Sequence, residues 1–344
     1  ERIIPDFRDS APLERHIIEQ RLWMMDEKSF IGTHYRSDEF NSDPYNRYTI
    51  IRARFDKWFS EKVQAAGALV ICEMTVKALL RNDSGRVIGV EVEREDGKIY
   101  ADAVILADGV NSLVATNAGL RKDIQAGNVA LAVKEMIFLP RETVEARFNL
   151  SGQAGVVIEM LGSITEGMVG TGFLYTNKDS LAIGVGGMLN DMKAQRTTPV
   201  ELLGKMKAHP AIAPLIAGGE TREYAAHLLP EGGYRALPQI YGDGWMLVGD
   251  SAGFVNSVHR EGSNLAMETG RLAAETLVEL FKAGKAPSSD NLSRYRAKLD
   301  ESFVMKDMKK YQKIPETLYN PPQCINDYPP VWSCAAQQYF SVDG

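Results

Sequence analysis

The stretch GWMLVGDSAGFVNSVHREGSNLAMETGRLAAE, residues 244–275, limits the possible folds more strongly than any other segment. A short apolar run leads into Gly249 and Asp250, a glycine-rich loop follows, and a long amphipathic segment begins near Ser263. This order predicts a buried strand, a loop and a helix, as in doubly wound α/β folds. Ligands of such folds bind beyond the carboxyl ends of the strands, where Asp250 is expected to project.

The loop and the start of the predicted helix suit an electron-rich ligand. Gly249, Gly253 and Gly262 allow the backbone to approach a ligand closely. A helix that starts near Ser263 presents free amide groups and the positive end of its dipole, which favour a phosphate or a reduced flavin ring. The residues alone are equally consistent with an aspartate, Asp250, that only caps its own loop.

Two further segments resemble parts of such a site. Residues 48–68, YTIIRARFDKWFSEKVQAAGA, predict an amphipathic helix, with Arg52 before it as a candidate for an anionic ligand. Residues 100–112, YADAVILADGVNS, predict a buried parallel strand that brings Asp108 and Gly109 to the same sheet edge. For the first segment, an ordinary amphipathic surface helix with Asp56 as a solvated charge is the favoured interpretation. For the second, a plain strand-to-turn boundary is at least as consistent with the residues.

Strand patterns dominate residues 21–36, 69–109 and 128–230, with tight turns at the sequences DSG and EDG. The order of α/β segment, sheet segment and second α/β segment predicts an α/β fold with an inserted mixed or antiparallel sheet domain.

Two helix boundaries carry clear signals. A helix is expected after Thr198, with Pro199 in its first turn, and the helix from Ser263 should end at Lys282, shortly before Gly284. The tail is rich in proline and aromatic residues and is expected to form packed coil, since its VW and YF pairs would need burial.

Composition excludes several classes of protein. The 344 residues carry a net charge of −6 and no basic run, which argues against a nucleic-acid partner. Three scattered cysteines, Cys72, Cys324 and Cys334, cannot build a disulfide framework or a four-thiolate iron–sulfur site, and they favour a reducing compartment. The five histidines show no metal-ligand spacing, so no metal is expected.

In this order, the Arg-x-x-Phe-Asp-x-Trp helix, the strand end LADGVNS and the strand end GD resemble flavoproteins of the glutathione-reductase/hydroxylase type. Residues 226–276, AHLLPEGGYRALPQIYGDGWMLVGDSAGFVNSVHREGSNLAMETGRLAAET, narrow the likeness to the electron-transfer-flavoprotein:quinone oxidoreductases. Among these, the chain is similar over nearly its whole length to the Fix-type flavoproteins. The cofactor that this resemblance implies is FAD.

The resemblance also divides the chain into domains. An FAD-binding domain is expected from residues 1–20, 48–127 and 238–286, an inserted sheet domain on the quinone side from 21–47 and 128–237, and a helical or coil region from 287–344. The family's glycine-rich G-x-G-x-x-G strand-turn-helix does not occur in the chain, so roughly 50 residues of an N-terminal βαβ unit are expected to precede it.

The resemblance assigns a role to each candidate site residue. Asp250 would bind ribityl hydroxyls of FAD, and the helix start would face the pyrimidine edge of the flavin. His259 and Arg260 would lie by the isoalloxazine as catalytic residues; the alternative is a local ion pair, with Glu261, that shapes the loop. The full set of expected cofactor-binding residues is Arg52, Thr75, Val76, Asp108, Gly109, Gly249, Asp250, Gly262, Ser263 and Asn264, of which Thr75 and Val76 would offer backbone groups to the adenine.

The activity implied is transfer of electrons from an electron-transfer flavoprotein to quinone, in a complex linked to nitrogen fixation. The expected partners are FixA/FixB-like electron-transfer flavoprotein subunits and a FixX-like ferredoxin subunit that carries the iron–sulfur cluster. The chain would be cytoplasmic and peripheral at the inner face of the bacterial membrane.

Three alternatives remain open at this point: a geranylgeranyl reductase, an aromatic monooxygenase, and a non-catalytic subunit that needs partner chains. The geranylgeranyl reductase is disfavoured because GTGFLYTNKD stands where those enzymes usually have an aromatic-x-Trp-x-Phe-Pro stretch. The aromatic monooxygenase is disfavoured because Ser257 stands where those enzymes usually have a proline in the loop.

Overall fold

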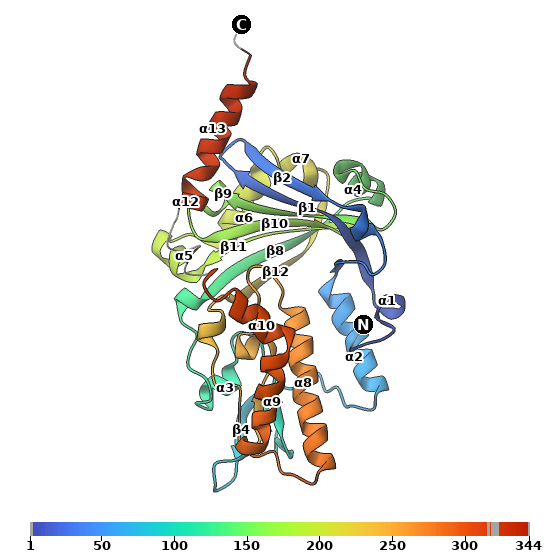
Figure 1. Ribbon diagram of the computed structural model, residues 1–344, viewed down its shortest axis with the longest axis vertical. Helices are drawn as coiled ribbons and strands as arrows, with labels where there is room; N and C mark the ends of the chain where they lie inside the picture. Colours follow the sequence, from blue (N-terminus) through green and yellow to red (C-terminus); the bar gives the residue numbers. More distant parts are fainter. Residues whose placement is uncertain (1–2, 315–316, 318–322, 343–344) are drawn as a thin grey trace.

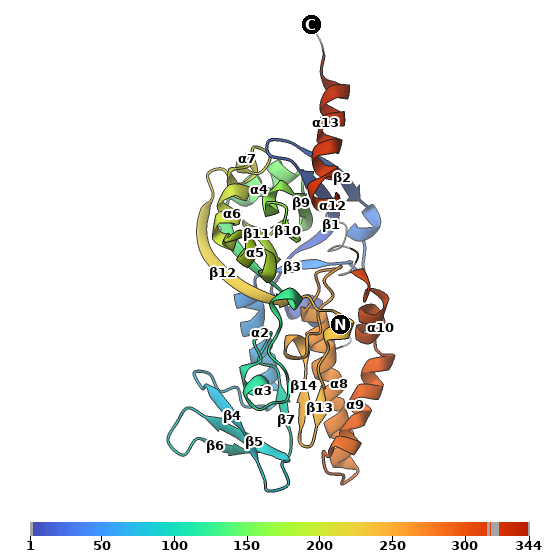
Figure 2. The same cartoon turned by 90° about the vertical axis from the view of Figure 1, so that its left-hand side faces the viewer.

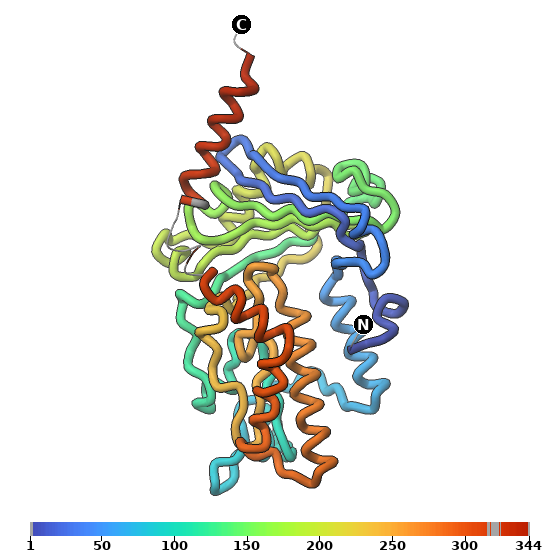
Figure 3. Tube along the Cα trace, viewed as in Figure 1, coloured from blue at the N-terminus to red at the C-terminus, as the bar shows by residue number. Residues whose placement is uncertain are grey.

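The computed structural model describes residues 3–314, 317 and 323–342, and it shows two parts stacked along the long axis of the molecule (Figure 1). A large sheet with helices on one side forms the upper part. Smaller sheets and the long helices α2 (Arg52–Ala65), α8 (Ser263–Lys282) and α9 (Ser289–Glu301) form the lower part. Figure 3 shows that the large sheet of the upper part comes from two separate stretches of the chain, and that the C-terminal helix also reaches it.

The large sheet has eight strands in the order β12-β8-β11-β10-β9-β1-β2, with β3 paired to β1. Only the β1–β9 pair is parallel among these neighbours; all the others are antiparallel. The strands are β1 (Leu13–Met25), β2 (Phe30–Arg36), β3 (Tyr48–Ile50), β8 (Val129–Phe138), β9 (Ala154–Gly162), β10 (Gly170–Thr176), β11 (Ser180–Met188) and β12 (Glu220–Pro230).

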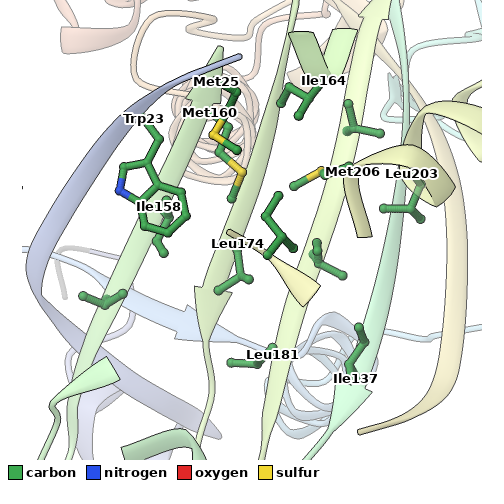
Figure 4. Packing of buried hydrophobic residues seen from close by; sticks show 14 of the residues in the cluster. Trp23, Met25, Ile137, Ile158, Met160, Ile164, Leu174, Leu181, Leu203 and Met206 are labelled. Carbon is green, nitrogen blue, oxygen red and sulfur yellow. The ribbon is translucent and has the colours of Figure 1, made fainter. Parts of the chain in front are cut away.

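One face of this sheet carries the upper core (Figure 4). On β9 the alternation of a strand is plain, because Val156, Ile158 and Met160 are fully buried whereas Val157 and Glu159 on the other face are only partly buried. The helices that cover the core are α4 (Arg141–Phe148), α5 (Leu189–Gln195), α6 (Pro199–Ala208) and α7 (Ala213–Ile216). Glu159 therefore faces away from this core.

The lower part is built on a three-stranded sheet, β13 (Tyr241–Gly242), β14 (Trp245–Leu247) and β7 (Val104–Leu106). Strands β14 and β7 run parallel, with Met246 opposite Ile105. A second core joins this sheet to α8, α9 and the helices α3 (Leu113–Asn117) and α10 (Phe303–Lys310). An antiparallel sheet of β4 (Val76–Arg81), β5 (Val87–Val92) and β6 (Lys98–Tyr100) lies at the far end (Figure 2).

Helix α8 follows the predicted pattern and bounds. Leu265, Leu272 and Leu280 lie on one buried stripe, which packs the helix against β14 and α9. The helix ends at Lys282, and Gly284 adopts a left-handed backbone conformation with φ of +63°, as expected just after a helix.

Most of the other predicted elements are confirmed. Two strands flank the turn within residues 21–36, and Thr198 caps α6 in a capping box with Glu201. The structure places β12 within residues 128–230, where strand patterns predicted a mixed sheet. It also begins β1 at Leu13 and pairs β3 with β1, so the large sheet extends across the expected domain boundaries at residues 20 and 48.

Two predictions about chain segments are wrong. Residues 69–75, at the start of the segment 69–109 that was expected to be rich in strands, form no strand. Leu69 is 89% exposed, and β4 begins only at Val76. Within the described part of the tail, the packed coil is replaced by α12 (Gln323–Asn326) and α13 (Tyr328–Phe340). The prolines at the start of α13 fit the first turn of a helix, where no amide hydrogen is needed.

Candidate cofactor site at the strand ends

Two aspartates lie at the carboxyl ends of the parallel strands β7 and β14. Asp108 follows β7 by two residues, and Asp250 lies in a 3₁₀ turn, Gly249–Ala252, just after β14. The strands are in register from Trp245 opposite Val104 to Leu247 opposite Leu106, so both aspartates reach the same sheet edge. The parallel pairing predicted from the sequence is therefore confirmed.

Asp250 is a partly buried carboxylate that makes no hydrogen bond through its side chain to the described residues. Burial raises the pKa of Asp250, and the charges of His227 and Arg52 act in the opposite direction. Because a carboxylate loses hydration when it is buried, an unpaired one is costly unless a ligand supplies donors. Asp250 is thus an available acceptor.

The amino end of α8 lies beside Asp250. A Cβ atom added to Gly262, the residue before the helix, would stand 3.6 Å from Asp250 Oδ1. No side chain caps this end, and the first backbone hydrogen bond of the helix is donated by the Ala266 amide to the Gly262 carbonyl. The amides of Ser263 and Asn264 therefore lie in the uncapped first turn, which carries the positive end of the helix dipole.

Gly249 is required by its local geometry. Its φ is +55°, and a Cβ atom there would lie 3.1 Å from the Cβ of Ala266 on α8. The backbone amide of Gly249 donates to Thr269 Oγ1 at 3.0 Å, which fixes the loop against the helix. A larger residue at position 249 would separate the strand end from α8.

Asp108 is held differently from Asp250. Its carboxylate accepts from the hydroxyls of Ser112 at 3.0 Å and Ser251 at 2.9 Å, and from the amide of Val114 at 3.2 Å. Both serines are fully buried. Asp108 therefore ties the end of β7 to the loop of Asp250, and its role is positioning. Gly109 follows it with φ of +77° and open space at its Cβ position, so its backbone is accessible.

Arg52 lies close enough to Asp250 to lower the pKa of that carboxyl, although the two residues are far apart in the sequence. It is the first residue of α2 and forms a bidentate pair with Asp56, at 3.0 and 3.1 Å. Asp56, expected to be a solvated charge, is instead this partner. The structure thus brings Arg52 near Asp250, with its side chain 59% exposed, and its contact with a ligand stays a prediction.

The loop from Asn256 to Glu261 connects Asp250 to α8. Asn256 and Glu261 exchange two backbone hydrogen bonds, and Asn256 Oδ1 accepts from the amides of Val258 and His259. These two donors identify the oxygen, so the remaining side-chain atom is the Nδ2 donor. Asn256 Nδ2 is buried and has no hydrogen-bond partner in the described part of the chain.

Three consecutive side chains anchor this loop to three different elements. His259 Nε2 lies 2.9 Å from Tyr311 Oη, just after α10. Arg260 pairs with Glu159 of β9 at 3.6 Å, and Glu261 pairs with Arg47 at 3.4 Å. The predicted alternative of an ion pair within the loop is therefore not what forms, because the partners of His259 and Arg260 come from other elements.

Thr75 and Val76 lie on a different sheet from Asp250. Val76 begins β4, and the carbonyl of Thr75 accepts from the Glu93 amide at 2.9 Å. Both residues are exposed, so other backbone and side-chain atoms there remain accessible. Their expected contact with adenine stays a prediction.

The sequence aligns along its full length with proteins named FixC. The chain is 59% identical to Protein FixC of Azotobacter vinelandii over 344 residues, which is 100% of this chain and 79% of that protein. It is 55% identical to Protein FixC of Bradyrhizobium diazoefficiens, with the same coverage of both chains. The chain belongs to the FixC family.

The membership confirms the likeness to Fix-type flavoproteins, and a solved structure confirms the fold. The geranylgeranyl bacteriochlorophyll reductase-like protein of Thermoplasma acidophilum superposes with a TM-score of 0.72 at 19% identity, over 92% of this chain and 76% of that one. An identity this low speaks for the fold alone. No family model matches the sequence.

Several residues at the site of this FixC-family chain have no local signal in the sequence. The charge of His227, on β12, works to lower the pKa of Asp250. The charge of Glu231, just after β12, works to raise the pKa of Arg260. Both lie in the segment AHLLPEGG that carries the family likeness, but only the path of β12 places them at the strand ends.

The described residues show neither a metal-binding cluster nor a membrane-spanning helix. No group of three or more His, Cys, Asp and Glu side chains that could hold a metal ion occurs among the described residues. Within those residues there is also no helix with the length and apolarity needed to cross a membrane.

Proposed function

We propose that this FixC-family chain is an FAD-dependent oxidoreductase that passes electrons from an electron-transfer flavoprotein to quinone, within a Fix-type complex linked to nitrogen fixation. The observation that carries the proposal is the unpaired Asp250 carboxylate beside the uncapped amino end of α8. Family membership and the fold of flavin-dependent enzymes support it.

The residues at the strand ends fit FAD. Ribityl hydroxyls are donors that would pair with Asp250, whose side chain makes no hydrogen bond to the described residues. The amides at Ser263 and Asn264 would face the pyrimidine edge, which becomes more negative on reduction, and a helix amino end stabilises such charge by about 0.3–2 kcal/mol. The bound flavin would supply the redox chemistry, while the protein positions it and sets its electrostatic environment.

Partner chains would complete the electron path. In this proposal FixA/FixB-like subunits deliver the electrons, and a FixX-like subunit carries the iron–sulfur cluster. Cys72 and Cys334 are exposed free thiols, and two such thiols fall short of the four that a cluster needs. Cys324 lies in α12, but its side chain is outside the described residues.

A peripheral membrane contact would bring quinone to the protein, and α13 supports this part of the proposal. The helix contains no charged residue and extends away from the large sheet (Figures 1 and 2). Its side chains include Trp332, Tyr339 and Phe340, which are 54%, 80% and 77% exposed. Aromatic side chains on an uncharged surface suit the boundary between lipid headgroups and acyl chains.

Vesicle flotation tests the membrane contact. Trp332→Glu places a charge on α13 and is expected to reduce binding to vesicles of bacterial polar lipids by about tenfold or more. Tyr100→Glu is the matched control, because Tyr100 is 67% exposed on β6 at the opposite end of the molecule. Equal flotation of the two variants would exclude α13 as the contact.

The activity itself is tested with the purified protein and each candidate reductant. Flavin released by denaturation is expected at about one FAD per chain, and a reduced electron-transfer flavoprotein should drive reduction of a soluble quinone analogue. A flavin-free protein, or one that leaves quinone oxidised under these conditions, would refute the proposal.

A geranylgeranyl reductase is the second candidate, because the structural likeness to the Thermoplasma acidophilum protein extends over 92% of this chain. It predicts that a prenyl diphosphate or prenylated lipid loses double bonds when the flavin is reduced, which mass spectrometry would detect. An aromatic monooxygenase predicts oxygen-dependent hydroxylation of an aromatic compound instead. A non-catalytic subunit would show none of these reactions without its partners.

A further inference from the structure

Three charged side chains from three separate elements meet where the large sheet touches the lower part. Arg260 comes from the loop before α8, Glu159 from β9, and Glu231 from the residue after β12. Arg260 Nη2 lies 3.6 Å from Glu159 Oε2, and each of these two side chains is 30% exposed. The hydroxyl of Ser257, in the same loop as Arg260, interacts with the Glu231 carboxylate.

The charges in this cluster do not balance when every group is ionised. Glu159 provides the direct ion pair to Arg260, which leaves Glu231 as a second, excess carboxylate. A partly buried group of one cation and two carboxylates is electrically neutral only when one carboxyl holds a proton. Burial raises the pKa of Glu231 to about 7, although Ser257 and Arg260 act to lower it. Glu231 therefore gains and loses a proton near neutral pH.

The place of Glu231 links its proton to the candidate cofactor site. Its backbone amide donates to the Asn128 carbonyl at 2.8 Å, which fixes the residue at the edge of the sheet. Its carboxylate faces Ser257 and Arg260, within the loop that runs from Asp250 to the amino end of α8. Arg260 lies in the loop just before α8, so negative charge that arrives at the helix start acts on the same partly buried cluster as Glu231.

We propose that Glu231 is the group that takes up a compensating proton when electrons arrive at the cofactor and releases it when electrons leave. The inference rests on the proposed function. Two electrons and one proton added to a flavin leave one extra negative charge, and the carboxylate of Glu231 balances it by taking one proton from solvent. Transfer of both electrons to quinone then consumes two protons, one from the cofactor and one from Glu231, and yields quinol.

The other charged groups around Glu231 do not take this role. Arg260 stays positive, because both carboxylates favour its charged form although burial lowers its pKa. Glu159 is committed to Arg260 by a direct ion pair. His227, four residues earlier on β12, interacts electrostatically with Asp250, where its charge works to lower the pKa of that carboxyl. Glu231, just after β12, is the carboxyl of this three-residue cluster that has no direct ion pair among the described residues and that has a neutral hydrogen-bonding neighbour in Ser257.

Proton uptake during reduction tests the proposal directly. The purified protein is photoreduced at pH 8 in weak buffer, and a pH indicator reports the protons taken up per electron pair. Wild type is expected to take up nearly two protons, and Glu231→Gln only one, because glutamine keeps the shape and the polar contact with Ser257 but cannot be protonated. Glu223→Gln, on the adjoining strand β12 but 42% exposed, is expected to match wild type.

A second measurement does not depend on electron transfer. Infrared difference spectra between pH 6 and pH 8 should show a protonated carboxyl band that is lost in Glu231→Gln and kept in Glu223→Gln. The proposal is overturned if Glu231→Gln takes up as many protons as wild type, or if this band survives the substitution. A flavin-bearing protein that reduces quinone but fails these tests leaves the proposed function intact, whereas a flavin-free protein overturns both.

Discussion

Asp108 and Asp250 end neighbouring parallel strands and reach the same sheet edge, yet their carboxylates have opposite surroundings. Asp108 accepts three hydrogen bonds, from Ser112, Ser251 and Val114, whereas the side chain of Asp250 makes none to the described residues. The same local pattern, an apolar strand that ends on an aspartate, has thus produced one internal anchor and one carboxylate that can receive a ligand. The number of protein donors around each carboxylate separates the two roles.

The largest effect on stability is expected at the anchor. Asp108→Ala removes the acceptor of three hydrogen bonds and leaves the hydroxyls of Ser112 and Ser251, both fully buried, without it. Hydrogen bonds to charged groups contribute about 1.5–3 kcal/mol each but are not additive, so the free energy of unfolding should fall by about 3 kcal/mol. Urea denaturation measures this loss, and an unchanged midpoint would show that Asp108 is not the anchor.

Asp250→Ala should weaken flavin binding without lowering the stability of the cofactor-free protein. The flavin affinity is expected to fall about 10- to 150-fold, because a charged hydrogen bond to ribityl hydroxyls is worth about 1.5–3 kcal/mol. The unfolding midpoint of the cofactor-free protein should not fall, since the Asp250 side chain has no hydrogen bond to the described residues to lose. Flavin content after gel filtration measures the first effect. Equal content in wild type and variant would remove Asp250 from the site.

The contrast between the two aspartates shows where sequence reasoning succeeds. The strand, the loop and α8 were predictable from residues 244–282, because an apolar run, turn glycines and a helix stop all lie within one continuous segment. The parallel pairing of β7 and β14 also follows from local pattern, since short apolar runs that end on Gly or Asp are typical of buried parallel strands.

The partners of these side chains were not predictable, because they come from distant parts of the chain. Arg52 and His227 meet Asp250 only through the packing of α2 and β12 against the strand ends. Glu159, Glu231 and Arg260 meet only because the large sheet folds back on the loop before α8. The tail was also predicted wrongly, since aromatic residues there were assumed to be buried but are exposed on α13.

Replacing each aspartate by asparagine should change stability at pH 7 in opposite directions. The folded state raises the pKa of Asp250, so its contribution is complete below the ordinary value of about 3.9 and is lost as the pH rises through the raised pKa. Asp250→Asn should therefore stabilise the cofactor-free protein at pH 7, with no gain near pH 3. Asp108→Asn should destabilise it at pH 7, because the amide is a weaker acceptor for Ser112, Ser251 and Val114.

Thermal unfolding at pH 3, 5 and 7 measures both variants against wild type. A stabilisation by Asp250→Asn that persists unchanged at pH 3 would mean that the carboxylate charge is not its cause. If Asp108→Asn stabilised the protein, Asp108 would not be an anchor, and the proposed difference in role between Asp108 and Asp250 would be wrong.

The smallest effect is expected at Arg260, which resembles Asp108 in having protein partners already. A cation near the flavin stabilises the added negative charge, so Arg260→Ala should lower the flavin potential and slow electron delivery to a soluble quinone analogue, with FAD content unchanged. Because Glu159 at 3.6 Å offsets much of this charge, the shift should be modest, about 10–30 mV. Glu159→Gln, which removes the direct ion-pair partner of Arg260, should raise the potential instead. Spectroelectrochemical titration measures the flavin potential of wild type and of the two variants. If the potential and the quinone-reduction rate match wild type in both variants, then Arg260 and Glu159 only hold the loop in place, as Asp108 holds the strand end.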